Sequence, residues 1–147
     1  MFSVYNWYKL SRILYLYKIP VLPLIIKMIM RVIFAAHIPY QAHIGKGCVL
    51  GDEGLGIAIH PRAVIGNNCV IGPHVLIGGT SHKYKVPRIG SNVLIGPGAK
   101  ILGPIIVEDN SVIGANSVVV SDVRSNSIVS GIPAKTIKEN IDINDYL

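Results

Sequence analysis

Aliphatic residues recur every six positions along most of the chain. They stand in one phase at Ile65, Ile71, Ile77, Ile89, Ile95, Ile101, Val107, Ile113 and Val119. Glycine follows most of them, and a small or β-branched residue usually stands four positions later. This spacing matches neither the 3.6-residue period of a helix nor the simple alternation of an open sheet. It predicts a coil of roughly eighteen residues with three short strands, in which aliphatic side chains of successive coils stack on one another.

The pattern resembles the hexapeptide-repeat family, whose fold is a left-handed parallel β-helix. The resemblance implies an all-β acyltransferase domain over residues 37–134, preceded by a short N-terminal helical segment. Residues 41–130 would hold about five coils of this length. Corner conformations that bulkier residues resist are expected at glycines and at Asn67, Asn68, Asn92 and Asn116.

A different pattern precedes the repeat, in residues 1–36. Residues 3–18 have the polar and apolar stripes of a short amphipathic helix, and residues 24–36 are predicted to form a second, more apolar helix. Pro20 and Pro23 separate the two helices. Two interpretations stay open. The segment is either a helical hairpin that caps the β-helix or packs between subunits, or an interfacial anchor on an anionic membrane.

Charge is distributed unevenly along the chain. The net charge is +6, and residues 1–107 carry eleven basic side chains but only two acidic ones, Asp52 and Glu53. Such a field favours anionic partners. Acids gather in the C-terminal tail, residues 135–147, whose acidic part we expect to be solvated and loosely ordered. Half of the residues are hydrophobic and 15% are charged, which excludes intrinsic disorder.

Cysteine usage and the lack of targeting signals indicate the cytoplasm. Cys48 and Cys69 form neither a disulfide scaffold nor a zinc motif, which is typical of buried thiols in a reducing compartment. No signal peptide is recognisable, and prolines and basic residues interrupt the apolar residues 13–36 too often for a membrane span. We therefore expect a cytoplasmic protein, at the inner face of the membrane if residues 1–36 act as an anchor.

The six-residue lattice is broken at two places, where we expect function to lie. The first break, residues 51–58, contains the two early acids. At the second, residues 79–88, Lys83 replaces the expected aliphatic residue, so the segment must leave the wall as a loop with His82 near its start. Asp52 and His82 are thirty residues apart, or five hexapeptides, which places them on different faces of one subunit. In a homotrimer, the acids of one chain could meet His82 of the next across a cleft.

Three segments carry a closer resemblance. Residues 71–82 are similar to the stretch of galactoside and maltose acetyltransferases that holds their catalytic histidine. This similarity implies that His82 is the general base of an acetyl-CoA-dependent O-acetyltransferase. Residues 52–57 and 95–103 resemble serine acetyltransferases. In that family an Asp–His pair supplies the base, and Glu53 stands here in place of the histidine.

The remaining site residues complete this prediction. Asp52 and Glu53 could orient the imidazole or bind the hydroxyls of the acceptor, and His60 is either a further acceptor contact that lines the cleft or a surface corner residue. Contacts to CoA are implied for Gly79, Pro97, Ala115, Lys135 and Lys138, and the two lysines suit its phosphates. No metal is implied. In the family, the backbone N–H at the position that matches Pro97 donates a hydrogen bond to the thioester oxygen. Proline has no N–H, so either Gly98 supplies the donor here or the oxyanion is held differently.

The main functional interpretation is an O-acetyltransferase that uses acetyl-CoA to modify a sugar hydroxyl of a cell-surface polysaccharide or its precursor. Serine O-acetyltransferase is the alternative, and Glu53 and the short helical segment argue against it. Alternatives of another class are a non-catalytic β-helix scaffold and a γ-type carbonic anhydrase, whose zinc-binding histidine pair at a spacing of five is missing here. Nucleic-acid binding has only the positive charge in its favour, and is not expected. Structural roles are expected for His37 and His43, and an exposed turn for His74.

Overall fold

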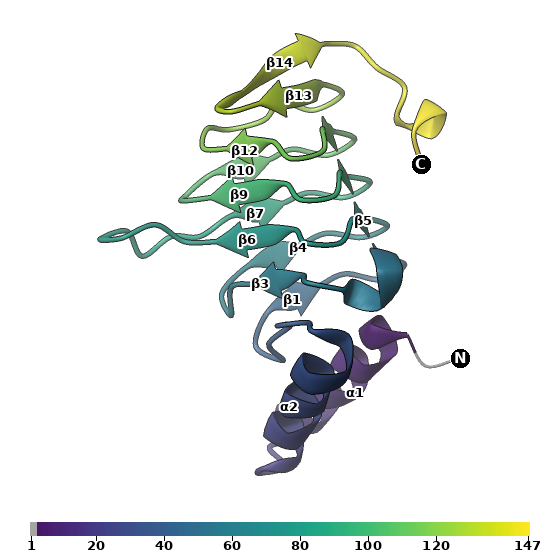
Figure 1. Cartoon of the computed structure of the whole chain (residues 1–147), viewed down its shortest axis with the longest axis vertical. Coiled ribbons are helices and arrows are strands. Elements are labelled where there is room, and N and C mark those ends of the chain that lie inside the picture. The colour runs from purple at the N-terminus through teal and green to yellow at the C-terminus, as the bar shows by residue number, and fades with distance from the viewer. Residues whose placement is uncertain (1–2) are drawn as a thin grey trace.

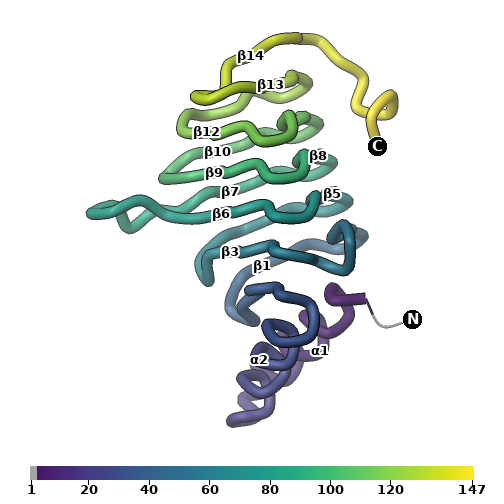
Figure 2. The backbone as a smooth tube through the Cα atoms, in the orientation of Figure 1, coloured from purple at the N-terminus to yellow at the C-terminus, as the bar shows by residue number. Residues whose placement is uncertain are grey.

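The computed structural model describes residues 3–147 and shows a parallel β-helix with two helices at one end (Figure 1). Helix α1 (Val4–Leu16) and helix α2 (Leu22–Phe34) pack against each other. From there the chain winds coil by coil toward the C-terminus, as the backbone trace shows (Figure 2). The fold predicted from the six-residue period is therefore confirmed.

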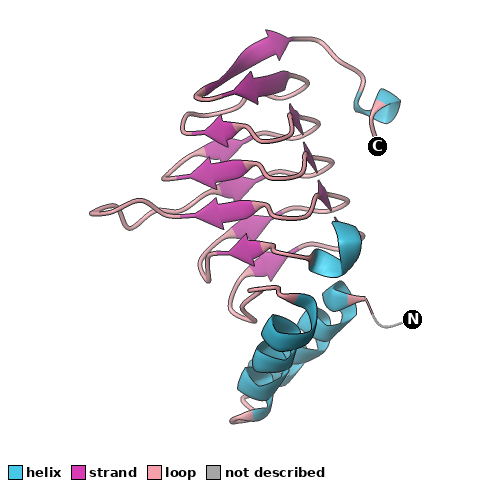
Figure 3. Ribbon diagram, viewed as in Figure 1, coloured by secondary structure: helices cyan, strands magenta, loops and turns pink. Residues whose placement is uncertain are grey.

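Three sheets of short strands form the walls of the β-helix (Figure 3). Sheet 1 contains β1 (His43–Ile44), β4 (Val64–Ile65), β7 (Arg88–Ile89) and β10 (Ile106–Val107). Sheet 2 contains β2 (Val49–Leu50), β5 (Val70–Ile71), β8 (Leu94–Ile95), β11 (Val112–Ile113), β13 (Ile128–Gly131) and β14 (Ala134–Lys138). Sheet 3 contains β3 (Ala58–Ile59), β6 (Leu76–Gly78), β9 (Lys100–Leu102) and β12 (Val118–Val119).

The β-helix has about four turns, so the expected number of five coils is wrong. Sheets 1 and 3 hold four strands each. Two irregular segments take up residues that the estimate had assigned to the walls. One is the 3₁₀ helix η1 (Gly51–Gly54) after β2, and the other is the long loop between β6 and β7.

The register stacks equivalent positions of the repeat on one another. Ile65 pairs with Ile44 on one side and Ile89 on the other, and all three side chains are buried. The small residues four positions after the aliphatics, such as Ala99, are also buried. Ser81 is the exception, because it lies in the loop that leaves the wall and is exposed.

Most of the predicted corner residues adopt the left-handed conformation. Asn68, Asn92 and Asn116 have φ values of 56°, 55° and 55°. His74 takes the same position in its coil with φ 58° and is exposed, as expected. Asn67 differs, because it does not have positive φ and instead accepts a hydrogen bond from the Lys46 backbone N–H at 2.9 Å.

The helices cap the open end of the β-helix. The Tyr8 hydroxyl donates to the Ala42 carbonyl at 2.7 Å and accepts from the Ile44 N–H at 3.0 Å, so it satisfies backbone groups of the first coil. Tyr8, Ile26 and Met30 are buried in the main core. The capping interpretation is therefore correct for the inward face of the hairpin. None of the described helices is long and apolar enough to cross a membrane.

The C-terminal tail folds back, so the expectation of a loosely ordered tail is wrong. Strand β14 pairs antiparallel with β13, and a short 3₁₀ helix, η2 (Ile143–Asp145), follows. Ile141 and Ile143 are buried against Val112 of sheet 2. The tail is otherwise polar, so its composition did not predict that Ile141 and Ile143 would be buried. The free thiols of Cys48 and Cys69 are buried, as predicted.

Candidate active site

Two corners of the β-helix, one along each edge of sheet 3, hold the predicted site residues other than Lys135 and Lys138. The chain passes from sheet 2 to sheet 3 at the donor corner, which contains Asp52 and Glu53 in η1, then Pro97 and Ala115 in later coils. It passes from sheet 3 to sheet 1 at the loop corner, which contains His60 and the segment 79–87. Asp52 and His82 thus lie at different corners, as their spacing predicts.

The donor corner is a closely packed ridge of backbone. A Cβ atom at Gly72 would lie 2.7 Å from the Pro97 nitrogen, and one at Gly96 would lie 2.6 Å from the Ala115 nitrogen. Neither glycine can carry a side chain without moving the turn above it. The coils therefore place Pro97 and Ala115 in one line along this edge.

The predicted substitute for the missing Pro97 N–H is already engaged. The Gly98 N–H donates to the Pro73 carbonyl at 2.9 Å, and this bond holds two coils together. An N–H that is committed to a structural bond cannot also stabilise a thioester oxygen without breaking it. Of the two options that the sequence left open, the structure favours an oxyanion donor other than Gly98.

Asp52 and Glu53 lie in the first coil, at the N-terminal end of the donor corner. Both side chains are exposed, and both backbones are left-handed, with φ 47° and 57°. Non-glycine residues rarely adopt this conformation, and two in succession turn the chain sharply outward. The carboxylates are thus presented to solvent or to another subunit instead of to the core.

The loop corner brings His60 and Gly79 together. A Cβ built on Gly79 would lie 3.8 Å from His60 Cδ2 and 3.9 Å from its Nε2. His60 Nδ1 accepts from the Arg62 backbone N–H at 3.1 Å, so the neutral ring carries its proton on Nε2. Burial, followed by the nearby Arg62 charge, lowers the pKa of His60 and favours this neutral form. His60 therefore has a hydrogen-bond donor at Nε2 and no free acceptor on its ring, which suits binding better than proton abstraction.

His82 lies in the loop that projects from the wall between β6 and β7 (Figure 2). Its side chain is exposed and its backbone is left-handed, with φ 64°. The loop leaves the wall where Lys83 replaces the expected aliphatic residue, as predicted from the broken lattice. An exposed imidazole on a protruding loop can reach a ligand or a neighbouring subunit.

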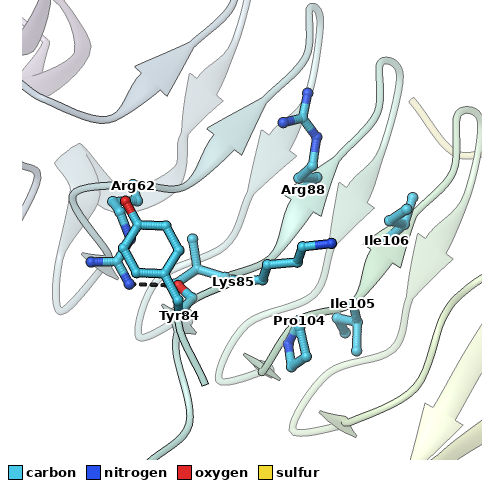
Figure 4. Close-up of a pocket in the computed structure, with 8 residues that line it drawn as sticks. Arg62, Tyr84, Lys85, Arg88, Pro104, Ile105 and Ile106 are labelled. Atoms are coloured by element: carbon cyan, nitrogen blue, oxygen red, sulfur yellow. Dashed lines mark hydrogen bonds between the residues drawn. The ribbon is translucent and has the colours of Figure 1, made fainter. Parts of the chain in front are cut away.

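Two residues that the sequence analysis did not single out hold this loop against the wall. The guanidinium carbon of Arg62 lies 4.0 Å from the centre of the Tyr84 ring, and its Nη2 donates to the Tyr84 carbonyl at 2.6 Å (Figure 4). A cation–π contact of this kind fixes both the ring and the loop backbone. No sequence signal pointed to this pair. The six-residue period is interrupted in the loop, so the spacing does not predict which wall residue Tyr84 contacts.

Arg62 and Tyr84 also border a pocket of about 440 Å³ on the sheet 1 side of the loop corner. Its lining comprises Arg62, Tyr84, Lys85, Val86, Arg88, Pro104, Ile105 and Ile106. Figure 4 shows Lys85 extending across the middle of the pocket, with Pro104 and Ile105 below it. Three cations and no acid line this pocket, so its field favours an anionic ligand.

The two predicted CoA-binding lysines lie beyond the last coil, on strand β14. Lys135 pairs with Ser130 and Lys138 pairs with Ile128 of β13. Ser130 and Ile128 flank Val129, whose side chain is buried. Both lysines are exposed. Gly114 brings the donor corner beneath this hairpin, because a Cβ there would lie 2.7 Å from the Ser130 hydroxyl oxygen.

The arrangement offers bases, hydrogen-bond donors and cations, but no metal centre. Within residues 3–147, no three histidine, cysteine, aspartate or glutamate side chains are grouped so that they could hold a metal ion. Sheet 3 separates the acids at one edge from His60 and His82 at the other, whereas His74 lies in the donor corner, where its backbone N–H donates to the Leu55 carbonyl at 2.8 Å. Chemistry that needs both the acids and His82 requires a second chain against this face.

Known proteins match most of the chain. The bacterial transferase hexapeptide (six repeats) family matches residues 87–121. The serine acetyltransferase of Synechococcus elongatus is 36% identical over 132 residues, which is 88% of this chain and 54% of that protein. The crystal structure of Neisseria gonorrhoeae serine acetyltransferase has a TM-score of 0.87 and 35% identity, covering 95% of this chain and 55% of the other.

A further solved structure carries a ligand. Serine acetyltransferase from Brucella abortus in complex with coenzyme A has a TM-score of 0.86 and 34% identity, covering 91% of this chain and 54% of the other. The chain thus spans about half the length of these relatives. Their names support the serine alternative better than the polysaccharide acceptor that the sequence led us to expect.

Proposed function

Since the chain carries the hexapeptide transferase repeat and is similar over its β-helix to serine acetyltransferases, we propose that it transfers an acetyl group from acetyl-CoA to the hydroxyl of L-serine. The observation that carries this proposal is the extent of the similarity, which covers 95% of the chain and both corners of the candidate site. The basic pocket beside the His82 loop adds support, because serine brings a carboxylate that cations attract.

The donor corner would hold acetyl-CoA. Pro97 and Ala115 form the ridge along which its chain would lie, and Lys135 and Lys138 at the end of that ridge would bind its phosphates as point charges. Gly79 of a neighbouring chain, from the opposite edge of its sheet 3, would contact the acetyl end. A Cβ there would lie 3.3 Å from Val86 Cγ1 and 3.8 Å from His60 Cδ2, so only a glycine leaves this place uncrowded.

His82 would act as general base. The serine hydroxyl oxygen forms a bond to the thioester carbonyl carbon while its proton passes to the imidazole. The C–S bond then breaks, and the imidazolium returns the proton to the departing thiolate. A histidine suits this exchange because its ordinary pKa, about 6.5, lies near neutral pH.

A homotrimer would complete the site. Asp52 and Glu53 lie at a different corner from His82, so only the carboxylates of a neighbouring chain could orient that imidazole or contact the acceptor. In a cyclic trimer, one face of each subunit meets a different face of the next, which brings unlike corners together. Sedimentation should then give a mass of about three chains.

A thiol-release assay tests the proposed reaction. The purified protein is given acetyl-CoA with L-serine, and in parallel with a panel of hexoses and amino sugars. We expect CoA release with L-serine, together with O-acetylserine as the product detected by mass spectrometry. CoA release with sugars but not with serine would restore the polysaccharide acceptor. Release with neither, by a protein that binds CoA, would overturn the proposed transfer.

A further inference from the structure

The hairpin of α1 and α2 caps the β-helix with one face and exposes an apolar face on the other. On α2, six large apolar side chains are exposed, and the extremes are Leu22 at 43% and Val32 at 84%. With 3.6 residues per turn they cover about half of the helix circumference, opposite the buried Ile26 and Met30. We call this set the outer helical face; it comprises Leu22, Leu24, Ile25, Met28, Val32 and Ile33.

Tyr17 and Val21, in the link between the helices, are exposed as well. On α1, Ile13 and Leu16 are also exposed, but they line a groove between that helix and Asn67 of the β-helix. Single exposed apolar residues are ordinary, but six on one half of a helix normally mark a surface that another molecule covers. The interior of the β-helix already has its cap, so this patch is not needed for capping.

The charge around the patch identifies the partner. Residues 1–51 contain no acidic side chain, and Lys18, Lys27 and Arg31 lie on or beside the hairpin. A second copy of the chain would bring the same positive charges against this face and be repelled. An anionic lipid surface accepts both features, because the apolar side chains enter the headgroup boundary while the lysines meet the phosphates.

We propose that the outer helical face binds the surface of an anionic bilayer, with the two helices lying in the plane of the interface. A helix of thirteen residues is about 20 Å long, which is too short to cross the hydrocarbon core. The helices lie at one end of the molecule, and the His82 loop projects from a later coil (Figure 3). Membrane binding therefore leaves the candidate active site open.

Vesicle flotation of the full-length protein tests this proposal. We expect binding to vesicles of phosphatidylcholine with phosphatidylglycerol, and little binding to phosphatidylcholine alone. Replacing both lysines (Lys18→Gln with Lys27→Gln) should weaken binding by roughly thirtyfold, because each basic residue near an anionic surface contributes about a fivefold gain in affinity. The apolar variant Met28→Ser with Val32→Ser should weaken it as well.

A matched control separates this face from general hydrophobicity. Val120→Ser replaces an apolar side chain that is 51% exposed at the far end of the β-helix, and it should float like the unaltered protein. CD melting of each variant shows that it is folded. The proposal is overturned if the unaltered protein ignores anionic vesicles, or if Met28→Ser with Val32→Ser only reduces the oligomer mass in sedimentation, which would make a second copy the occupant.

Discussion

Lys135 and Lys138 lie on the same outward side of strand β14, although a spacing of three would send them to opposite sides of a regular strand. The cause is an irregularity in the β13–β14 register, where Val129 pairs with Thr136 but Ile128 pairs with Lys138. The extra residue shifts the alternation by one position. Because Val129 points into the core, its neighbours and both lysines opposite them face outward.

This shared side predicts that the lysines act together on acetyl-CoA. Replacing both (Lys135→Ala with Lys138→Ala) should raise the KM for acetyl-CoA severalfold and leave kcat nearly unchanged, since the phosphates are bound equally before and during the reaction. Steady-state thiol release measures both constants. Lys46→Ala, which removes an exposed lysine from the opposite end of the β-helix, should change neither. A fall in kcat larger than the rise in KM would remove the lysines from this role.

The contact between Arg62 and Tyr84 predicts how firmly the loop is held. Tyr84→Ala removes the ring from the guanidinium and should increase hydrogen exchange across residues 79–87, while the stability of the whole fold falls by only about 1 kcal/mol. Tyr84→Phe keeps a ring and the backbone carbonyl that Arg62 binds, and should exchange at the original rate. Equal exchange in all three proteins would show that this pair does not fix the loop.

The Tyr8 hydroxyl bridges two backbone groups of the first coil. Tyr8→Phe leaves the Ile44 N–H without its partner in a buried place, which should lower the free energy of unfolding by about 1–3 kcal/mol. Urea unfolding followed by CD measures the change. The control is Tyr17→Phe, which removes a hydroxyl from a side chain that is 77% exposed and should have little effect. Equal stability of the two variants would contradict the capping role.

The donor corner depends on glycine where the coils approach most closely. Gly72→Ala would force a methyl group against the Pro97 nitrogen, 2.7 Å away, and should destabilise the protein by about 1–3 kcal/mol and raise the KM for acetyl-CoA. In Gly78→Ala the new carbon meets nothing closer than 3.5 Å, so stability should hold. Thermal unfolding and the thiol-release assay compare the two. If Gly72→Ala were as stable as Gly78→Ala, the Pro97 turn would be able to move away from the added methyl group, and close packing at this corner would not require glycine.

The sequence predicted the walls of the β-helix well because the repeat is a local signal. Ile65 and Ile89 mark the same position in successive coils, and a constant period places them in register without knowledge of the rest of the chain. The break at Lys83 likewise predicted that a loop leaves the wall, since a lysine cannot fill a buried position. The separation of Asp52 from His82 followed from counting hexapeptides.

Features that depend on the path of an irregular segment were not predictable in this way. The return of Tyr84 to Arg62 and the docking of Ile141 onto Val112 join segments whose separation in sequence has no period. The helical segment posed a different problem, because its composition fits a cap and a membrane anchor equally. Only the structure shows that the cap uses one face of the hairpin and leaves the other exposed.

The central claim, that His82 is the base of an acetyl transfer, is tested most directly by the turnover of His82→Ala with acetyl-CoA and L-serine. His43→Ala is the matched control, because His43 is also exposed but lies on strand β1 in the first coil, outside both corners of the candidate site. We predict that kcat of His82→Ala falls by at least about a hundredfold while the variant still binds CoA and keeps its oligomeric mass, and that His43→Ala keeps near-normal turnover. Near-normal turnover of His82→Ala would contradict the claim.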